Sequence, residues 1–191
     1  MQLKPEQVER FYETWWSLLG FVNRELGILP GMPRRTEEGS WLLADAVMVR
    51  DAVWEHESLR ERFLSQNPDD LPESELKEVA SWKDRVVGQF FVERYLKKHT
   101  IFIESSTSQV YGVLGLKSPI ESLFVLRPPF LIEGVLLPYH GKVIADGLFR
   151  QTGVEITFGS GIKRMLRGTY NAARDEGRII TSFGLNPRGV A

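Results

Sequence analysis

The spacing of apolar residues changes near Gly88, and this change constrains the fold more than any other feature of the sequence. Before Gly88, apolar residues recur at helical spacing, as in the stripe that contains Phe11, Trp15 and Val22. After it, short runs rich in β-branched and aromatic residues alternate with turn-forming residues. We therefore expect an α+β protein with a helical region over 1–88 and a β-rich region over 89–191, which together form one compact unit.

The helical region predicts about four helices. The first begins at Pro5 and stops at Gly27, because proline suits the first helical turn and glycine suits the position after the last. A linker over 29–39 follows. The other three helices are expected at about 40–56, where Ser40 is a candidate N-cap, at 57–66, and from 70–73 to about 87.

The β-rich region predicts a mainly antiparallel sheet or a small barrel, closed by an amphipathic helix. Residues 90–96 extend the preceding helix or form a strand, and their aromatic and β-branched content favours the strand. Further strands are expected at 100–104, 110–116, 130–137, 143–149, 154–158 and 179–183. A single helical turn follows Pro119, Asp146-Gly147 suggests a bulge, and the last helix runs over about 162–176.

Composition places the chain among ordinary globular proteins, with 42% hydrophobic and 26% charged residues. The formal net charge of −1 gives no argument for nucleic-acid or membrane binding from bulk charge. There is no cysteine, so disulfides, thiolate metal sites and thiol catalysis are excluded. We expect a cytoplasmic protein, since the first residues do not resemble a signal peptide and no apolar run approaches a transmembrane length.

The last predicted helix carries the sharpest functional signal. Helical geometry places Ile162, Met165, Leu166, Thr169 and Ala173 on the buried stripe, and a group of basic residues beside it. Glycines at its start leave backbone N–H groups open at the positive end of the helix dipole. An anion site for phosphate is predicted from these residues: Gly159, Ser160, Gly161, Lys163, Arg164, Arg167 and Arg174. The alternative is a solvated basic face, because such stripes are common on ordinary helices.

A second basic cluster lies before the strand expected at 100–104, and contains Arg94, Lys97, Lys98 and His99. If Lys97 and Lys98 share a face with the last helix, the two clusters make one basic surface able to contact phosphates. Taken separately, the cluster is a charged turn that protects a strand edge.

A third polar cluster consists of His140, Lys142 and Asp146. These side chains could act as base, cation and orienting group of an enzyme, with Glu155 as a further candidate. Turn chemistry explains them more simply, and the sequence offers no nucleophile. No metal and no cofactor is expected, since the histidines lack the spacing of metal ligands. Asp51 and Glu55 form a carboxylate pair at i, i+4 that could hold Mg²⁺, but solvent exposure explains this pair at least as well.

Parts of the second half are similar to known sequences. The stretches KKHTIFI (97–103) and LPYHGKVIADGL (137–148), and the segment 158–182, resemble a group of uncharacterised bacterial proteins of similar length. No activity is known for that group, so the resemblance implies only that this half is one evolved unit.

The sequence therefore predicts a non-enzymatic binding or adaptor protein. Its basic C-terminal surface contacts nucleic acid or a phosphorylated ligand, and its helical half contacts a protein partner. The alternative is a hydrolase or nuclease-like enzyme that uses His140, Lys142 and Asp146. A deep pocket joining His140 to Asp146 would favour the enzyme, and an exposed basic surface would favour the binding protein.

Overall fold

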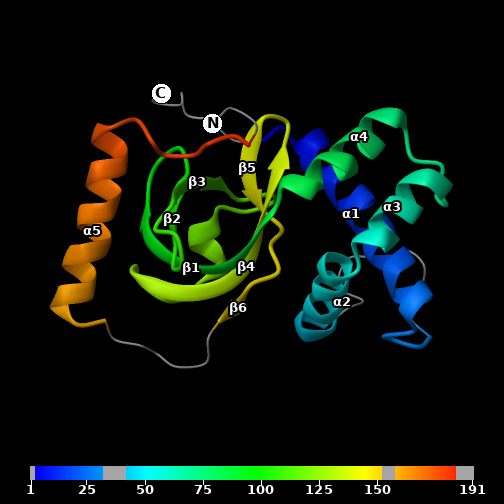
Figure 1. The fold of residues 1–191 in the computed structure, drawn as a ribbon, viewed down its shortest axis with the longest axis horizontal. Coiled ribbons are helices and arrows are strands. Elements are labelled where there is room, and N and C mark those ends of the chain that lie inside the picture. The colour runs from blue at the N-terminus through cyan, green and yellow to red at the C-terminus, as the bar shows by residue number, and fades with distance from the viewer. Residues whose placement is uncertain (1–2, 32–41, 152–157, 184–191) are drawn as a thin grey trace. The chain divides into compact units, whose positions relative to one another are not determined.

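The structure is a computed structural model that describes residues 3–31, 42–151 and 158–183, and it has the α+β class expected from the sequence (Figure 1). The chain divides into a helical unit, Leu3–Lys83, and a sheet unit that begins at Asp84. None of the helices within the described residues has the length and apolarity needed to cross a membrane.

The helical unit contains the four predicted helices, α1 (Pro5–Leu26), α2 (Leu43–Glu55), α3 (Glu57–Gln66) and α4 (Glu73–Ser81), and a short 3₁₀ turn, η1 (Trp82–Asp84). The bounds of α1 and α3 are those predicted. The fourth helix is shorter than predicted, because the chain tightens into η1 and Val86 already pairs with Leu136 in the sheet. The predicted N-cap of α2 is wrong, because α2 begins at Leu43 with Leu42 at the N-cap position; Ser40 itself lies outside the described residues.

Helix α1 is the centre of this unit. Gly27 ends it with a φ of 63°, a left-handed conformation that glycine adopts at low cost. Every residue from Ser17 to Asn23 is buried, so this part of α1 is covered on all sides. The two polar ends of that stretch are paired: Ser17 donates to Asp69, and Asn23 exchanges hydrogen bonds with the backbone of Leu29.

Large aromatic side chains form the core around α1. Trp15 is only 1% exposed and its ring stacks on Trp54 at a centroid distance of 5.6 Å. Trp82 meets Trp15 edge to face at 5.4 Å, and Phe11 lies against both Trp15 and Trp82. The predicted burial of the α1 stripe is therefore confirmed at Phe11 and Trp15, whereas Leu26 at its end is exposed.

The described residues of the sheet unit contain six strands: β1 (Val86–Tyr95), β2 (Thr100–Glu104), β3 (Val110–Leu114), β4 (Phe130–Tyr139), β5 (Lys142–Ala145) and β6 (Arg150–Gln151). They pair in the order β1-β2-β3-β5-β4-β6, and β1 also pairs with β4. The strands form the predicted sheet and not the small barrel that was its alternative. The sheet is mixed, because β3 and β5 are parallel while the other pairs are antiparallel. Residues 90–96 are thus strand and not helix, except for Leu96 at the turn.

The hairpin between β4 and β5 has the expected tight turn. His140 and Gly141 both have positive φ, 46° and 68°, which is the geometry of a two-residue turn between antiparallel strands. The return strand is shorter than predicted and ends at Ala145. The predicted irregularity at Asp146-Gly147 is present, because the four residues 146–149 between β5 and β6 stand opposite only Gly134 and Val135 of β4. The buried carboxylate of Asp146 accepts a hydrogen bond from the backbone N–H of Leu148 at 3.0 Å.

The inner face of the sheet encloses an apolar core with many aromatic rings, and its fully buried members include Phe90, Phe102 and Ile132. Gly134 on β4 is required there, because a Cβ at this position would come within 2.8 Å of the Phe149 ring. The helical turn predicted after Pro119 is present as a 3₁₀ turn, η2 (Ile120–Leu123), and contributes Ile120 to the core.

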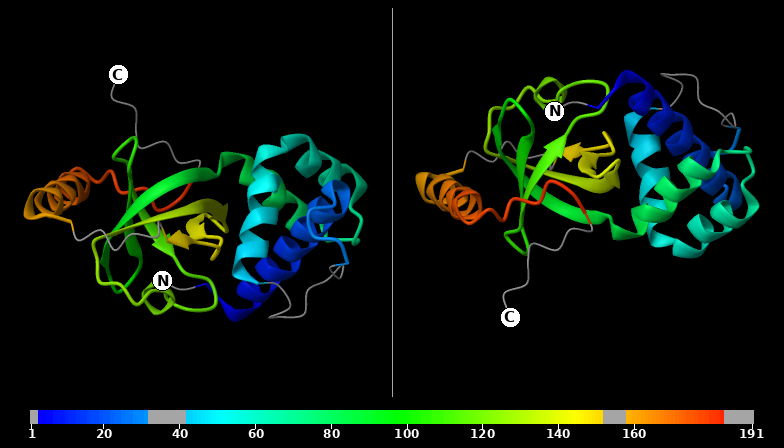
Figure 2. Two further views of the ribbon diagram at one scale, coloured as in Figure 1. Left: turned by 90° about the horizontal axis from the view of Figure 1, so that it is seen from below. Right: turned by 90° about the horizontal axis from the view of Figure 1, so that it is seen from above.

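The closing helix, α5 (Ser160–Asp175), lies along the outer side of the sheet (Figures 1 and 2). After α5 the chain returns to the sheet, where Gly112 donates to the carbonyl of Ile180 and Val143 donates to that of Thr181. The predicted strand 179–183 is therefore reduced to a single parallel bridge between Ile180 and Tyr111. The strand predicted at 154–158 falls largely outside the described residues.

Candidate anion-binding surface on the last helix

Three residues fix α5 on the sheet. Leu166, Tyr170 and Ala173 are 2%, 5% and 1% exposed, and their spacing of four and three residues places them on one face of the helix. They pack on apolar side chains of the first three strands and the segment after α5: Phe91, Ile101, Ile103, Val110 and Ile179. The helix is thereby held with a defined side toward the sheet and the rest toward solvent.

The buried stripe predicted for this helix is partly wrong. Leu166 and Ala173 are buried as expected, but Ile162 is 39% exposed and Met165 is 57% exposed. The physical reason is a rotation of the helix about its axis that brings Tyr170, absent from the prediction, onto the sheet. Thr169, also assigned to the stripe, is partly exposed and its hydroxyl donates to the carbonyl of Met165 at 3.1 Å.

Arg94 explains why Tyr170 faces the sheet. Its guanidinium carbon lies 4.0 Å from the centroid of the Tyr170 ring, a cation–π contact. The register of β1 shifts between Val92 and Arg94, so an irregularity at Glu93 redirects the strand at this point. Glu93 accepts two hydrogen bonds from Arg94, and this pairing raises the pKa of the Arg94 guanidinium above its ordinary value. Arg94 is therefore a docking residue for α5.

The basic residues of α5 fall into two groups. Lys163, Arg164 and Arg167 are exposed, and within the described part of the chain none of them has a carboxylate partner. Arg174 differs, because it forms an ion pair with Asp175 at 2.8 Å and its guanidinium carbon lies 5.7 Å from the Tyr170 ring. The hydrogen bond that Arg174 donates to the Asp175 carboxylate raises the pKa of Arg174. The positive charge that is not locally neutralised therefore lies on the first two turns.

The start of α5 is open to solvent. Gly159, Ser160 and Gly161 are exposed, and the first turn contains no acidic residue. The Gly159 carbonyl accepts the N–H of Lys163 at 3.3 Å, so the amides that precede Lys163 have no partner within the helix. A Cβ at Gly159 or Gly161 would meet no atom within 4 Å, so packing does not require glycine at either position.

Lys97 and Lys98 lie in the turn between β1 and β2, which closes with a hydrogen bond from the Leu96 N–H to the His99 carbonyl at 3.0 Å. Both lysine side chains are exposed. His99 is half-buried, and burial lowers the pKa of its imidazole. Its ring lies so close to Gly112 that a Cβ there would approach the ring carbon Cδ2 to 2.9 Å, so His99 has a packing role. Of this predicted cluster, Arg94 is the member that contacts α5.

The three residues of the polar cluster proposed for catalysis lie along one hairpin and the residue that follows it. His140 lies in the β4–β5 turn against Tyr139, and Lys142 begins β5. Asp146 follows the other end of β5, four residues from Lys142, which corresponds to about 13 Å along a strand. Glu155, the further candidate, lies outside the described residues. Asp146 thus follows the end of β5 that lies away from the turn with His140.

No group of three or more histidine or carboxylate side chains suited to holding a metal ion occurs in residues 3–31, 42–151 and 158–183. The carboxylate pair considered for Mg²⁺ lies on α2, where Asp51 accepts a hydrogen bond from Nε of Arg50 at 2.7 Å. That contact gives Asp51 a structural partner.

Comparison with known proteins gives no relative from which a site could be transferred: the chain matches no family model, no curated protein and no solved structure.

Sequence reasoning missed the pairing of Glu93 with Arg94 and the docking of Tyr170. A signal for both existed. Tyr170 follows Leu166 by four residues and precedes Ala173 by three. This spacing places all three side chains on one face of the helix. The neighbouring Glu93 and Arg94 also form a charge pair inside an apolar strand, which is a poor place for an unpaired cation.

Proposed function

We propose that this protein is a non-enzymatic binding protein that contacts nucleic acid or a phosphorylated ligand through the first turns of α5. One observation carries the proposal: Lys163, Arg164 and Arg167 project from a docked helix and have no carboxylate partner among the described residues. Cations in this state are available to phosphates without first breaking an ion pair.

The helix itself adds to this charge. Its exposed first turn contributes open N–H groups and the positive end of the helix dipole, both of which favour an anion. Lys163 and Arg167 are one turn apart, so their Cβ atoms lie about 5–6 Å from each other and can contact the same or adjacent phosphates. Arg174, which the sequence placed in the same site, is assigned a weaker role because Asp175 neutralises it.

An enzyme built on His140, Lys142 and Asp146 has less support. Asp146 follows one end of β5, whereas Lys142 begins the other end and His140 lies in the turn before it. The carboxylate of Asp146 already accepts a hydrogen bond from the Leu148 N–H. No observation favours this second function over the first.

The test is the salt dependence of binding. Fluorescently labelled single- and double-stranded DNA and RNA are titrated with the protein at several salt concentrations, with inorganic phosphate and common nucleotides as competitors. Binding dominated by phosphate contacts gives a log–log slope of roughly one per phosphate engaged. Replacing Lys163 and Arg167 together by Ala should lower that slope by up to about two and leave the fold intact.

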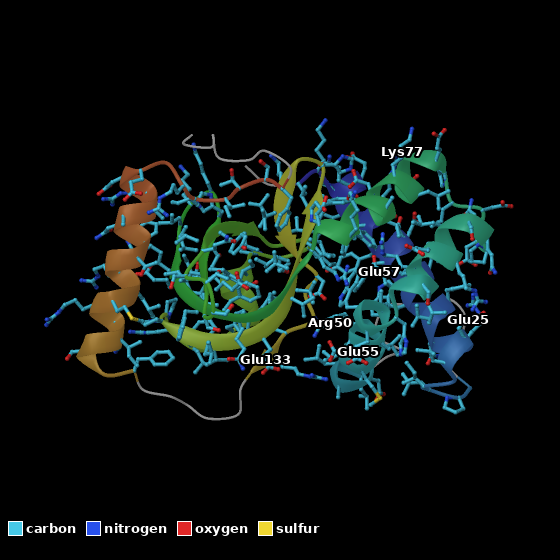
Figure 3. All side chains as sticks on the ribbon, in the orientation of Figure 1. Glu25, Arg50, Glu55, Glu57, Lys77 and Glu133 are labelled. Atoms are coloured by element: carbon cyan, nitrogen blue, oxygen red, sulfur yellow. The ribbon has the colours of Figure 1, made fainter. Side chains whose placement is uncertain are left out.

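A matched control removes the same charge elsewhere. Arg62→Ala with Lys77→Ala also deletes two exposed cations, but each of these is paired in the helical unit, Arg62 with Glu25 and Lys77 with Glu73, both at 2.8 Å. Figure 3 labels Glu25 and Lys77, one member of each pair. This control should change the slope little. No detectable binding to any of the probes, or an equal loss in both double variants, would overturn the proposal.

A further inference from the structure

One flank of the docked face of α5 carries two exposed apolar side chains, Ile162 and Met165. Met165 directly follows Arg164, so the two side chains leave the helix about 100° apart. Ile162 lies three residues before Met165, on the same side of the helix. Both apolar side chains are substantially exposed, at 39% for Ile162 and 57% for Met165, although α5 has an apolar face already occupied by the sheet. These two residues are thus not needed to dock the helix.

Gly168 lies between Arg164 and Met165 on the helix surface. It follows Arg164 by four residues and Met165 by three, so it is the neighbour of both on the helix surface. Glycine in a helix interior costs about 1 kcal/mol relative to alanine. Nothing in the fold requires it here, because a Cβ at Gly168 would meet no atom within 4 Å and the residue is exposed. The missing side chain leaves a shallow gap between Arg164 and Met165 through which another chain can approach the helix backbone.

We infer that the ligand of this surface is single-stranded nucleic acid. Its phosphates contact Arg164 and Arg167, its unpaired bases lie on Met165 and Ile162, and its backbone crosses the helix at Gly168. This inference rests on the proposed function and narrows it to one class of ligand.

Charge and apolarity together select the single strand. A duplex presents phosphates on its outside and keeps its base faces stacked, so it would leave Met165 and Ile162 exposed. A single strand presents phosphates and apolar base faces side by side, which matches a helix surface on which Arg164 and Met165 lie on either side of Gly168. An anionic membrane surface also combines charge with apolarity, but interfacial helices insert a broad apolar face. On α5 that face, with Leu166, Tyr170 and Ala173, is buried against the sheet.

The experiment compares oligodeoxythymidine with a duplex of equal length at one salt concentration, for the full chain and two variants. We expect the single strand to bind at least about tenfold more tightly. Gly168→Ala and Met165→Ser should each weaken single-strand binding by about fivefold or more and leave duplex binding unchanged. Gly168→Ala should not lower the melting temperature, since alanine favours the helix, so its loss of binding would not reflect unfolding.

Val125→Ser is the matched control for Met165→Ser, because Val125 is fully exposed in the same unit and lies outside α5. It should bind as the unchanged protein does. If the Lys163 and Arg167 double variant loses affinity while Gly168→Ala and Met165→Ser do not, or if the duplex binds as tightly as the single strand, this inference is wrong and the proposed function stands. If vesicles of phosphatidylserine and phosphatidylcholine bind through Met165 and no oligonucleotide binds, both are wrong.

Discussion

Positive side chains have different surroundings in the helical unit and on α5. In the helical unit, Arg60 is buried and donates to Glu57 and to the carbonyls of Val79 and Ala80, while Arg62 and Lys77 form ion pairs on the surface. On the first turns of α5, the cations project into solvent and have no carboxylate partner in the described residues. The difference separates cations that are paired within the fold from cations that have no carboxylate partner among the described residues.

The largest expected effect lies in the core of the helical unit. Trp15→Ala removes a ring that contacts Phe11, Trp54 and Trp82, and it should lower the free energy of unfolding by about 3–5 kcal/mol. Chemical denaturation followed by circular dichroism measures this. A loss below about 1 kcal/mol would show that the aromatic cluster is not the core of this unit and would reopen α1 as a partner surface.

A buried cation should matter less than the core but more than a surface pair. Arg60→Met leaves the Val79 and Ala80 carbonyls without their donor, and we expect a loss of about 1–3 kcal/mol. Lys77→Met breaks an exposed i, i+4 pair and should cost about 0.5 kcal/mol or less. Equal effects in denaturant titrations of the two variants would contradict the distinction between buried structural cations and surface ones.

In the sheet unit, two tyrosines should ionise late. Burial raises the pKa of Tyr111 and of Tyr95 from 10.0 to about 12, with Glu104 and Glu121 respectively acting in the same direction. A raised pKa in the folded state stabilises the fold below pH 10 and loses that contribution as the pH rises toward 12. Phenolate absorbance of the folded protein should therefore show two groups that titrate near pH 12. Titration of every tyrosine near pH 10, while the protein is still folded, would refute this.

The sequence predicted local features well. Pro5 and Gly27 bound α1, His140-Gly141 makes the predicted turn, and the strand at 100–104 has its predicted limits, because each depends on residues close together in the chain. Features that depend on distant residues were missed. The parallel pairing of β3 with β5 joins segments about thirty residues apart, which no local pattern encodes.

The candidate site shows the same limit. The sequence identified the basic residues of α5, but helical periodicity alone could not tell which apolar flank would dock. The contact between Arg94 of β1 and Tyr170 of α5 fixes the rotation of the helix about its axis. In this rotation Met165 is exposed. The pairing of Arg174 with Asp175 could have been predicted, because the two residues are adjacent in the sequence. It distinguishes Arg174 from the α5 cations that have no carboxylate partner among the described residues.

The smallest expected effect on stability belongs to Lys163 and Arg167 of α5. Lys163→Ala with Arg167→Ala should change the free energy of unfolding by less than about 0.5 kcal/mol, because neither side chain has a described partner and alanine favours the helix. A loss above about 2 kcal/mol would show that these residues hold α5 in place and are structural after all.

The account is tested most directly by the slope of log affinity against log salt for a single-stranded oligonucleotide, measured with the unchanged protein and with the Lys163 and Arg167 double variant. We predict a steep slope for the unchanged protein and one lower by up to about two for the variant, with the fold intact by circular dichroism. Identical slopes and affinities would contradict the account, since the phosphate contacts would then lie elsewhere on the molecule.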